Sequence, residues 1–233
     1  MTMIRNLFVS LIHLFYPHVC NNCGEGLTPA ENVLCLRCQH RLPLTGFHLY
    51  ADNTLEKVFW GRTKVCHAMA AYYYNQGAVV RRLVHQFKYH RRRDIALHLG
   101  RQMGFMLQQS AWLNEIDCIV PVPLHKAKTR RRGYNQSALL AAGLSEIIRR
   151  PVLPHALQRL NYTDSQTRKN RVSRWENVSG VFTARETAGL RGRHVLLIDD
   201  VFTTGATLQA CALAAHDAGA SAIYALTVSA ARS

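Results

Sequence analysis

Hydrophobic positions along the chain follow two spacings that predict strands and helices in alternation. Short aliphatic or aromatic runs that predict strands occupy residues 67–75, 117–123, 152–157, 194–200 and 221–231. Apolar residues at helical spacing predict helices within residues 79–87, 94–106, 136–148 and 208–219, with Asp94 and Asn135 as caps and Gly219 as a stop. Because several strands are aliphatic throughout, the pattern indicates an α/β fold with a mainly parallel sheet flanked by helices.

The first part of the chain does not follow this alternation. Apolar residues at helical spacing from Ile4 to Phe15 predict an amphipathic helix that packs on the rest of the fold, with a role at a membrane surface as the alternative. No small-residue cleavage site follows this segment, and no apolar run reaches the roughly 18 residues of a membrane span, so neither a signal peptide nor stable membrane insertion is expected. We place the N-terminal helix and a cysteine module at residues 1–45 and an α/β domain at residues 46–233, with a linker around residues 42–64.

Four of the seven cysteines form a module in the stretch CNNCGEGLTPAENVLCLRC, at Cys20, Cys23, Cys35 and Cys38. Two pairs of this spacing suit a tetrahedral Zn²⁺ site, and four thiolates leave no open position, which makes the site structural. A pair of disulfides is the alternative, although without a signal peptide we expect a reducing, cytoplasmic compartment that favours metal. His18 or His40 in place of one cysteine is a further alternative. The remaining thiols are predicted to be packed in the fold, at Cys66, Cys118 and Cys211.

Positive charge dominates the composition. Lys and Arg total 29 against 14 Asp and Glu, a formal net charge of +15. The excess is clustered at residues 91–93, 126–132 and 168–174, which favours a phosphate-rich partner over a basic surface kept for solubility. Tyr89 and Tyr134 lie within or near these runs, where they either stack on bases or pack in the fold. The candidate nucleic-acid contacts are Arg91, Arg92, Arg93, Lys126, Lys128, Arg130, Arg131 and Arg132.

Two adjacent carboxylates, Asp199 and Asp200, end an aliphatic strand in the stretch VLLIDDVFTTGAT. Ligands of open α/β sheets bind beyond such strand ends, where loops lead into helices. The small turn at residues 203–207 lets backbone N–H groups converge on a phosphate, helped by the dipole of the following helix. The acids suit the vicinal hydroxyls of a ribose and, through water, Mg²⁺. A ribose 5-phosphate satisfies both halves, whereas the structural alternative is a buried strand that ends in a capped turn.

This stretch resembles the phosphoribosyl pyrophosphate (PRPP) signature of type I phosphoribosyltransferases along its whole length. VPVPLHKAKTRRRGYNQSALLA resembles the pyrophosphate-binding loop and following helix of one branch, the ComF/GntX family, and QTRKNRVSRWENVSGVF resembles its mobile loop, with Gln166, Arg171, Asn177 and Phe182 on matching positions. Together with the cysteine module, the resemblance extends from Cys20 to Ala230. It implies a phosphoribosyltransferase-like (type I PRTase) α/β domain preceded by a small zinc-ribbon-like module.

The resemblance also implies roles for individual residues. Asp199 and Asp200 are expected on the ribose hydroxyls, and the 5-phosphate is expected among Thr203, Thr204, Gly205, Ala206 and Thr207. Pyrophosphate is expected at the backbone of a rigid turn that leaves a strand end, formed by Val122, Pro123, Leu124 and His125. The mobile loop is expected to close over the site as a lid, and Arg171 on it is a candidate catalytic residue beside the two acids.

The ComF/GntX family is used in natural competence and in the consumption of external DNA. The resemblance therefore implies a cytoplasmic protein that handles single-stranded DNA beside a helicase-like partner, with a PRPP-binding domain. The alternative is an active phosphoribosyltransferase that uses PRPP with Mg²⁺, releases pyrophosphate and transfers ribose 5-phosphate to a base that the sequence does not identify. A PRPP-sensing regulator is a third alternative, although no helix-turn-helix is readable. The sequence indicates neither the oligomeric state nor whether the zinc module contacts DNA.

Overall fold

The computed structural model describes residues 18–74, 78–160 and 181–231. Contacts divide the chain between Leu42 and Pro43 into a small N-terminal unit and a larger α/β unit. Whether the two segments predicted at residues 1–45 and 46–233 are independently folding domains stays a prediction. The amphipathic helix expected in residues 1–16 lies outside the described residues. Within the described residues, no helix combines the length and the apolar character needed to cross a membrane.

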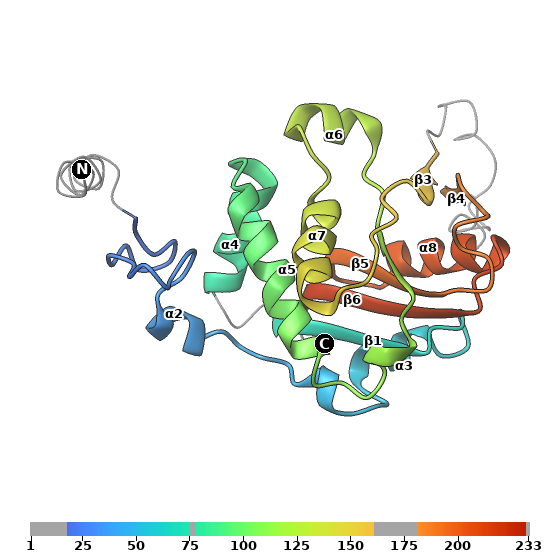
Figure 1. Ribbon diagram of the computed structural model, residues 1–233, viewed down its shortest axis with the longest axis horizontal. Coiled ribbons are helices and arrows are strands. Elements are labelled where there is room, and N and C mark those ends of the chain that lie inside the picture. The colour runs from blue at the N-terminus through green and yellow to red at the C-terminus, as the bar shows by residue number, and fades with distance from the viewer. Residues whose placement is uncertain (1–17, 75–77, 161–180, 232–233) are drawn as a thin grey trace, which may run out of the picture. The chain divides into compact units, whose positions relative to one another are not determined.

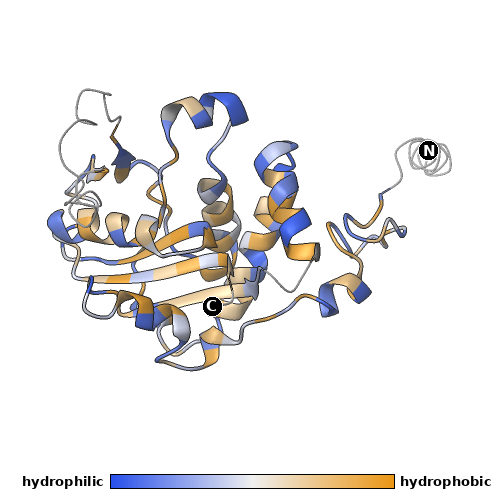
Figure 2. Ribbon diagram, turned by 180° about the vertical axis from the view of Figure 1, so that it is seen from behind, coloured by the Kyte–Doolittle hydropathy of each residue, from blue (hydrophilic) through white to orange (hydrophobic). Residues whose placement is uncertain are grey.

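The larger unit is built on a parallel sheet of four strands in the order β1-β6-β5-β2. Strands β1, β6 and β5 are labelled in Figure 1. The strands are β1 (His67–Tyr73), β2 (Cys118–Pro121), β5 (His194–Phe202) and β6 (Ala222–Ala230). Most of their residues are buried, and Figure 2 shows the sheet mainly in hydrophobic colours. A sheet buried on both faces needs apolar residues at consecutive positions, which is the pattern read from the sequence. The predicted α/β class is therefore confirmed.

Four longer helices flank the sheet: α4 (Ala78–Tyr89), α5 (Arg93–Leu107), α7 (Gln136–Ile148) and α8 (Ala206–Asp217). The connection from β1 to β2 crosses the sheet in the opposite direction to that from β5 to β6. Because such crossovers are right-handed, α5 and α8 cover opposite faces. Helix α7 packs along α5 at glycine contacts: a Cβ on Gly100 would lie 2.3 Å from the carbonyl oxygen of Leu140, and one on Gly143 would lie 2.2 Å from that of Leu97.

The remaining elements correct several predictions. The linker expected at residues 42–64 contains the 3₁₀ helix η1 (Phe47–Leu49) and helix α3 (Thr54–Phe59), which Asn53 and Glu56 close with a capping box. That helix is short and its apolar residues are few, so periodicity missed it. Residues 152–157 do not form the expected strand. Val152 makes a single parallel bridge to Ile119, and the chain then enters a small antiparallel pair, β3 (Leu157–Arg159) and β4 (Phe182–Ala184).

Two helix starts also test the predictions. Asn135 caps α7 as expected, because its side-chain oxygen accepts a hydrogen bond from the Ser137 N–H at 3.1 Å. Asp94 does not cap α5: it lies in the first turn, paired with Arg92 at 2.6 Å, and the N-cap position is Arg92 itself. A short 3₁₀ turn, η2 (Leu113–Glu115), precedes β2. The basic segment expected as loop forms helix α6 (Lys126–Arg132), which is largely hydrophilic in Figure 2.

The small unit contains one described helix, α2 (Leu36–His40), and a bridge between Val19 and Gly26. A tight turn follows Cys20, whose carbonyl accepts from the Gly24 N–H at 3.0 Å, and Gly24 adopts φ 77°. Its buried residues are mainly the cysteines with Val33 and Leu34. So small an apolar core does not hold a segment of this length together without a further link between its two halves.

Candidate functional site

The two predicted acids lie side by side where β5 reaches the carboxyl end of the sheet. Oδ1 of Asp199 accepts hydrogen bonds from the Ser137 hydroxyl at 3.1 Å and from the Asp200 N–H at 2.8 Å. The Asp199 side chain is half-buried. Burial, together with the neighbouring charge of Asp200, raises its pKa to about 7. A bound cation or hydroxyl donors would therefore favour the charged form of Asp199.

Asp200 has a partner that the sequence did not reveal. Its Oδ1 accepts from Lys88 Nζ at 2.8 Å, and both side chains are largely buried, with 15% and 19% exposed. Lys88 belongs to α4, which is far from β5 in the sequence. The only sequence signal was that α4 is a basic helix, which did not distinguish Lys88 from its neighbours. Lys88 thus joins Asp199 and Asp200 at the same end of the sheet.

The turn after the acids presents backbone N–H groups at a helix start. Gly205 occupies the N-cap position of α8 with φ 76° and provides no side-chain cap, while most of the other turn residues are exposed. A Cβ on Gly205 would lie 2.9 Å from the Phe202 ring, so the turn is tight as well as left-handed. A small pocket beside the turn is lined by Asp199, Val201, Phe202, Thr203, Gly205, Ala206, Thr207 and Leu208. Asp199 and the turn therefore line one small opening, whereas Asp200, which pairs with Lys88, is not among the residues that line it.

The second predicted segment reaches the same edge of the sheet. The Val122 N–H donates to the Ile198 carbonyl at 3.0 Å, which holds the end of β2 against β5 one residue before the acid pair. Asn135 Nδ2 donates to the Val122 carbonyl at 3.0 Å. His125 caps α6, because its Nδ1 accepts from the Ala127 N–H at 3.2 Å. The sequence therefore placed residues 122–125 correctly at a strand end, but α6 follows at once where a longer loop was expected.

Two of the three basic clusters come together in space. The Arg93 guanidinium lies over the Tyr134 ring at 5.1 Å, and that of Arg132 lies over the Tyr89 ring at 5.2 Å. Tyr134 is buried and its hydroxyl donates to the carbonyl of Phe87, so it packs rather than offering a stacking surface. Tyr89 is 57% exposed. These contacts join residues 91–93 to α6, whereas the cluster at residues 168–174 lies outside the described residues.

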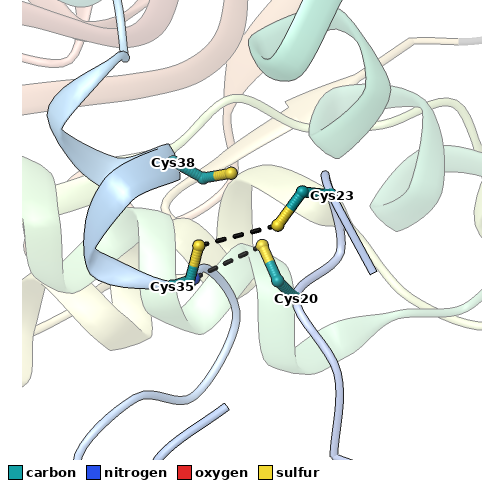
Figure 3. A group of neighbouring side chains, drawn as sticks. All are labelled: Cys20, Cys23, Cys35 and Cys38. Atoms are coloured by element: carbon teal, nitrogen blue, oxygen red, sulfur yellow. Dashed lines mark hydrogen bonds between the residues drawn. The ribbon is translucent and has the colours of Figure 1, made fainter. Parts of the chain in front are cut away.

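The four cysteines of the small unit converge on one point. Their sulfur atoms all lie within 4.8 Å of one another, and Sγ of Cys23 is 3.7 Å from Sγ of Cys35 (Figure 3). Four thiolates around one Zn²⁺ at about 2.3 Å stand about 3.8 Å apart, so this donor set fits a tetrahedral metal. All seven cysteines are unpaired, which excludes the disulfide alternative in this structure. Among the other thiols Cys118 and Cys211 are buried as predicted, but Cys66 is exposed, which corrects that prediction.

Backbone and amide groups support the sulfur atoms. The Cys35 N–H donates to Sγ of Cys20 at 3.3 Å, and Asn22 Nδ2 donates to Sγ of Cys38 at 3.2 Å. Burial acts to raise the pKa of Cys20, but hydrogen bonds from backbone groups of Cys23, Cys35 and Asn22 lower it to about 6. Such N–H···S bonds stabilise thiolates, the form in which cysteine binds metal. His18 Nε2 instead lies 3.0 Å from the Asn32 carbonyl oxygen.

The chain is 32% identical over 209 residues to DNA utilization protein YhgH of Escherichia coli K12, and the match covers 88% of this chain and 87% of that protein. The chain belongs to the ComF/GntX family. Competence protein F of Haemophilus influenzae is 26% identical to this ComF/GntX protein over 211 residues, which cover 84% of this chain and 89% of that protein. No family model matches the chain.

Similar solved structures overlap the ComF/GntX protein only in part. Glutamine PRPP amidotransferase of B. subtilis superposes with a TM-score of 0.45 at 20% identity, over 62% of this chain and 30% of that protein. Hypoxanthine phosphoribosyltransferase of Trypanosoma cruzi superposes with a TM-score of 0.37 at 13% identity, over 58% of this chain and 67% of that protein. The second of these proteins is a phosphoribosyltransferase by its name, and the name of the first includes PRPP.

The raised pKa of Asp199 predicts how pH affects the stability of this ComF/GntX protein without ligand. Because that pKa is raised in the folded state, the stabilising contribution is complete below the ordinary pKa of an aspartate and is lost as pH rises through about 7. Asp199→Asn keeps an oxygen for both hydrogen bonds without the charge. It is therefore expected to raise stability at pH 8 by about 4 kcal/mol, because the pKa rises by about three units at roughly 1.4 kcal/mol per unit. That corresponds to on the order of 10 °C in Tm for a chain of this size. The gain should shrink as pH falls and nearly vanish at pH 4, close to the ordinary pKa of an aspartate; an equal gain at pH 4 and pH 8 would contradict this.

The structure does not reach every candidate residue. Arg171 and the rest of the predicted mobile loop lie outside the described residues, which end at residue 160 and resume at residue 181. Phe182, the last residue of that motif, is buried in β4. Of the candidates that are described, Asp199, Asp200, the turn at residues 203–207 and residues 122–125 meet at one edge of the sheet. The basic residues of α6 and the α4–α5 junction form a neighbouring group.

Proposed function

We propose that this ComF/GntX protein serves the uptake and use of external DNA. In this proposal it binds PRPP or a related ribose 5-phosphate at residues 199–207 and single-stranded DNA on a basic surface. The observation that carries the proposal is that Asp199, with Asp200 next to it in the chain, lines one opening with a helix start that has no side-chain cap. The names of the relatives, a DNA utilization protein and a competence protein, support the cellular role.

The chemistry of the opening suits a sugar phosphate. The amides at residues 203–207 and the positive end of the α8 dipole would hold the 5-phosphate. Asp199 and Asp200 would accept hydrogen bonds from the two ribose hydroxyls, or bind Mg²⁺ through water. Mg²⁺ would neutralise the pyrophosphate that PRPP carries. Residues 122–125 stand at the adjacent strand end, and their backbone would meet that pyrophosphate.

The proposed basic surface runs from the junction of α4 and α5 to α6. Its residues are Arg91, Arg92, Arg93, Lys126, Lys128, Arg130, Arg131 and Arg132. The cation–π contacts of Arg93 with Tyr134 and of Arg132 with Tyr89 support the proposal that these residues form one continuous surface. Arg92 already forms an ion pair with Asp94, so we expect it to contribute less than the other arginines to phosphate binding. A backbone-tracking surface of this kind binds single strands mainly through phosphate charge.

The salt dependence of DNA binding should report these contacts. Log affinity for an oligothymidylate should fall linearly with log salt, with a slope of roughly −0.7 for each phosphate contacted. Arg130→Ala/Arg131→Ala is expected to make that slope shallower by about 1.4, because two exposed contacts are removed. Fluorescence anisotropy across a salt series measures this. Arg62→Ala/Lys64→Ala removes two exposed charges elsewhere and should leave the slope unchanged. An affinity that does not change with salt concentration would contradict the proposed DNA-binding surface.

We also propose that Cys20, Cys23, Cys35 and Cys38 bind one structural Zn²⁺. The sulfur distances and the N–H···S bonds support this assignment. The metal would supply the link between the two halves of the small unit and would carry no catalytic step, since four thiolates complete its coordination. We further propose that the protein is cytoplasmic and acts beside a helicase-like partner, as the family resemblance implies.

The cellular role is tested by growth. A strain that lacks this protein should grow normally on glucose but fail with DNA as the sole carbon source. A plasmid copy of the wild type should restore growth, whereas Asp199→Asn/Asp200→Asn should not. Normal growth of the deletion strain on DNA would remove the proposed cellular role, whatever the isolated protein binds.

A further inference from the structure

A second cavity lies along α4, outside the residues assigned so far to PRPP or to the basic surface. Its volume is about 460 Å³, and its lining includes Tyr74, Arg81, Arg82, His85, Lys88 and Tyr89. This volume falls within the range of roughly 300–1,000 Å³ typical of small-molecule sites. The named lining residues are basic or aromatic, and no carboxylate occurs among the described residues that line the cavity.

The lining provides two kinds of contact. Arg81 and Arg82 are exposed, and Lys88 adds a further ammonium group at the side nearest Asp200. Tyr89 is 57% exposed, its ring centroid is 4.7 Å from that of His85, and the Arg132 guanidinium lies 5.2 Å over it. The ring of Tyr89 therefore already serves as a platform for planar and cationic groups. Cations and aromatic planes together are what a phosphate attached to a nucleobase requires.

We propose that this cavity binds one nucleotide, with its phosphate at Arg81 and Lys88 and its base stacked at Tyr89. A simple anion would not need the aromatic side chains, and an uncharged aromatic ligand would not need the cations. The ligand is either a free nucleoside monophosphate or one unit of a single strand that continues onto α6, to which Arg132 connects the cavity. Only the second source rests on the proposed DNA role.

Lys88 places the cavity next to the acid pair. Lys88 lines it and also donates to Asp200 at 2.8 Å, so the cavity adjoins the acid pair. A nucleotide in the cavity would therefore lie beside the proposed sugar-phosphate site without occupying the amides at residues 203–207. Variants for the test should spare Lys88, because its loss would disturb both places.

Calorimetry with deoxyadenosine monophosphate tests the inference on the full chain. We expect saturable binding that is at least tenfold weaker for deoxyadenosine and for inorganic phosphate. Tyr89→Ala should weaken it about tenfold, in line with the usual contribution of one base stack. Arg81→Ala should weaken it by a similar factor, because a charge-assisted contact to the phosphate is lost. Arg62→Ala and Tyr50→Ala remove an exposed arginine and an exposed tyrosine elsewhere, and each should stay within twofold of the wild type. Circular dichroism confirms that each variant is folded.

A labelled oligothymidylate distinguishes the two sources. If Arg81→Ala and Tyr89→Ala weaken both ligands, the cavity serves the strand; if they weaken only the monophosphate, its ligand is a free nucleotide. Either result supports the inference. Absence of monophosphate binding, or equal binding by all four variants, would overturn it. If the oligothymidylate fails to bind the wild type while the monophosphate binds, the proposed DNA surface fails and the nucleotide cavity stands.

Discussion

Replacing both Asp199 and Asp200 with asparagine is expected to abolish measurable binding of PRPP with Mg²⁺ and to leave affinity for single-stranded DNA unchanged. Each carboxylate would hold a ribose hydroxyl or a metal-bound water through a charge-assisted hydrogen bond, worth about 1.5–3 kcal/mol. Loss of two such bonds lowers affinity by at least about 100-fold. The basic surface keeps all its cations, so DNA binding should not fall. Calorimetry with PRPP and anisotropy with an oligothymidylate measure the two effects on one preparation.

A charge-matched control makes this result specific. Asp52→Asn/Asp217→Asn removes two exposed carboxylates away from the opening and should bind PRPP as the wild type does. The Asp199→Asn change relieves an unfavourable burial, whereas Asp200→Asn leaves the largely buried Lys88 without its charged partner. Thermal melting of the double variant is therefore measured first, and PRPP binding is compared at a temperature where both proteins are folded. PRPP affinity within threefold of the wild type would refute the role of the acid pair.

Removing the metal is expected to have the second large effect. Purified protein should carry one zinc per chain, and Cys20→Ser/Cys38→Ser should carry less than a tenth of that. Structural zinc contributes about 10–16 kcal/mol to the folding of small modules, far more than the few buried side chains of this unit provide. The small unit should therefore unfold, while the thermal transition of the parallel sheet remains. Elemental analysis and limited proteolysis between residues 18 and 42 report the two outcomes.

The exposed thiol Cys66 provides the control for that experiment. Cys66→Ser removes a cysteine outside the cluster and should keep full zinc content and the protease resistance of the small unit. A Cys20→Ser/Cys38→Ser variant with normal zinc, or a small unit that stays protected without metal, would contradict the structural role. Zinc in the wild type that cannot be removed except by denaturing the whole chain would show that the metal also supports the larger unit.

Elements with strong local signals were predicted well from the sequence. The aliphatic runs became β1, β2, β5 and β6, because residues buried on both faces of a parallel sheet must be apolar at consecutive positions. Helix α7 began at its predicted cap because Asn135 has the side chain that closes a helix start. Helix α3 was missed because its six residues are too few for a helical hydrophobic period, and its start is marked instead by Asn53, which also donates to the Ala68 carbonyl in β1. Such a tertiary bond leaves no periodic signal.

In the candidate site, too, the residues that are contiguous in the sequence were predicted, and those brought together only by folding were missed. The acid pair and its turn are contiguous, so one short stretch of sequence contained them. Lys88 was missed because it reaches Asp200 from a helix far away in the chain, and only the packing of α4 creates that contact. The basic clusters were found, but their adjacency depends on Arg93 and Arg132 reaching tyrosines of the other cluster. The segment after His125 was expected as loop, because a run of basic residues carries no helical hydrophobic pattern.

The most direct test is an experimental structure with ribose 5-phosphate bound. The central claim predicts phosphate density at the amides of residues 203–207, with both ribose hydroxyls within hydrogen-bond distance of Asp199 and Asp200. It also predicts that Lys88 moves or exchanges its contact as Asp200 takes up a hydroxyl. A ligand found elsewhere, or an opening that stays empty at saturating ligand while the acids keep their present hydrogen bonds, would contradict the claim.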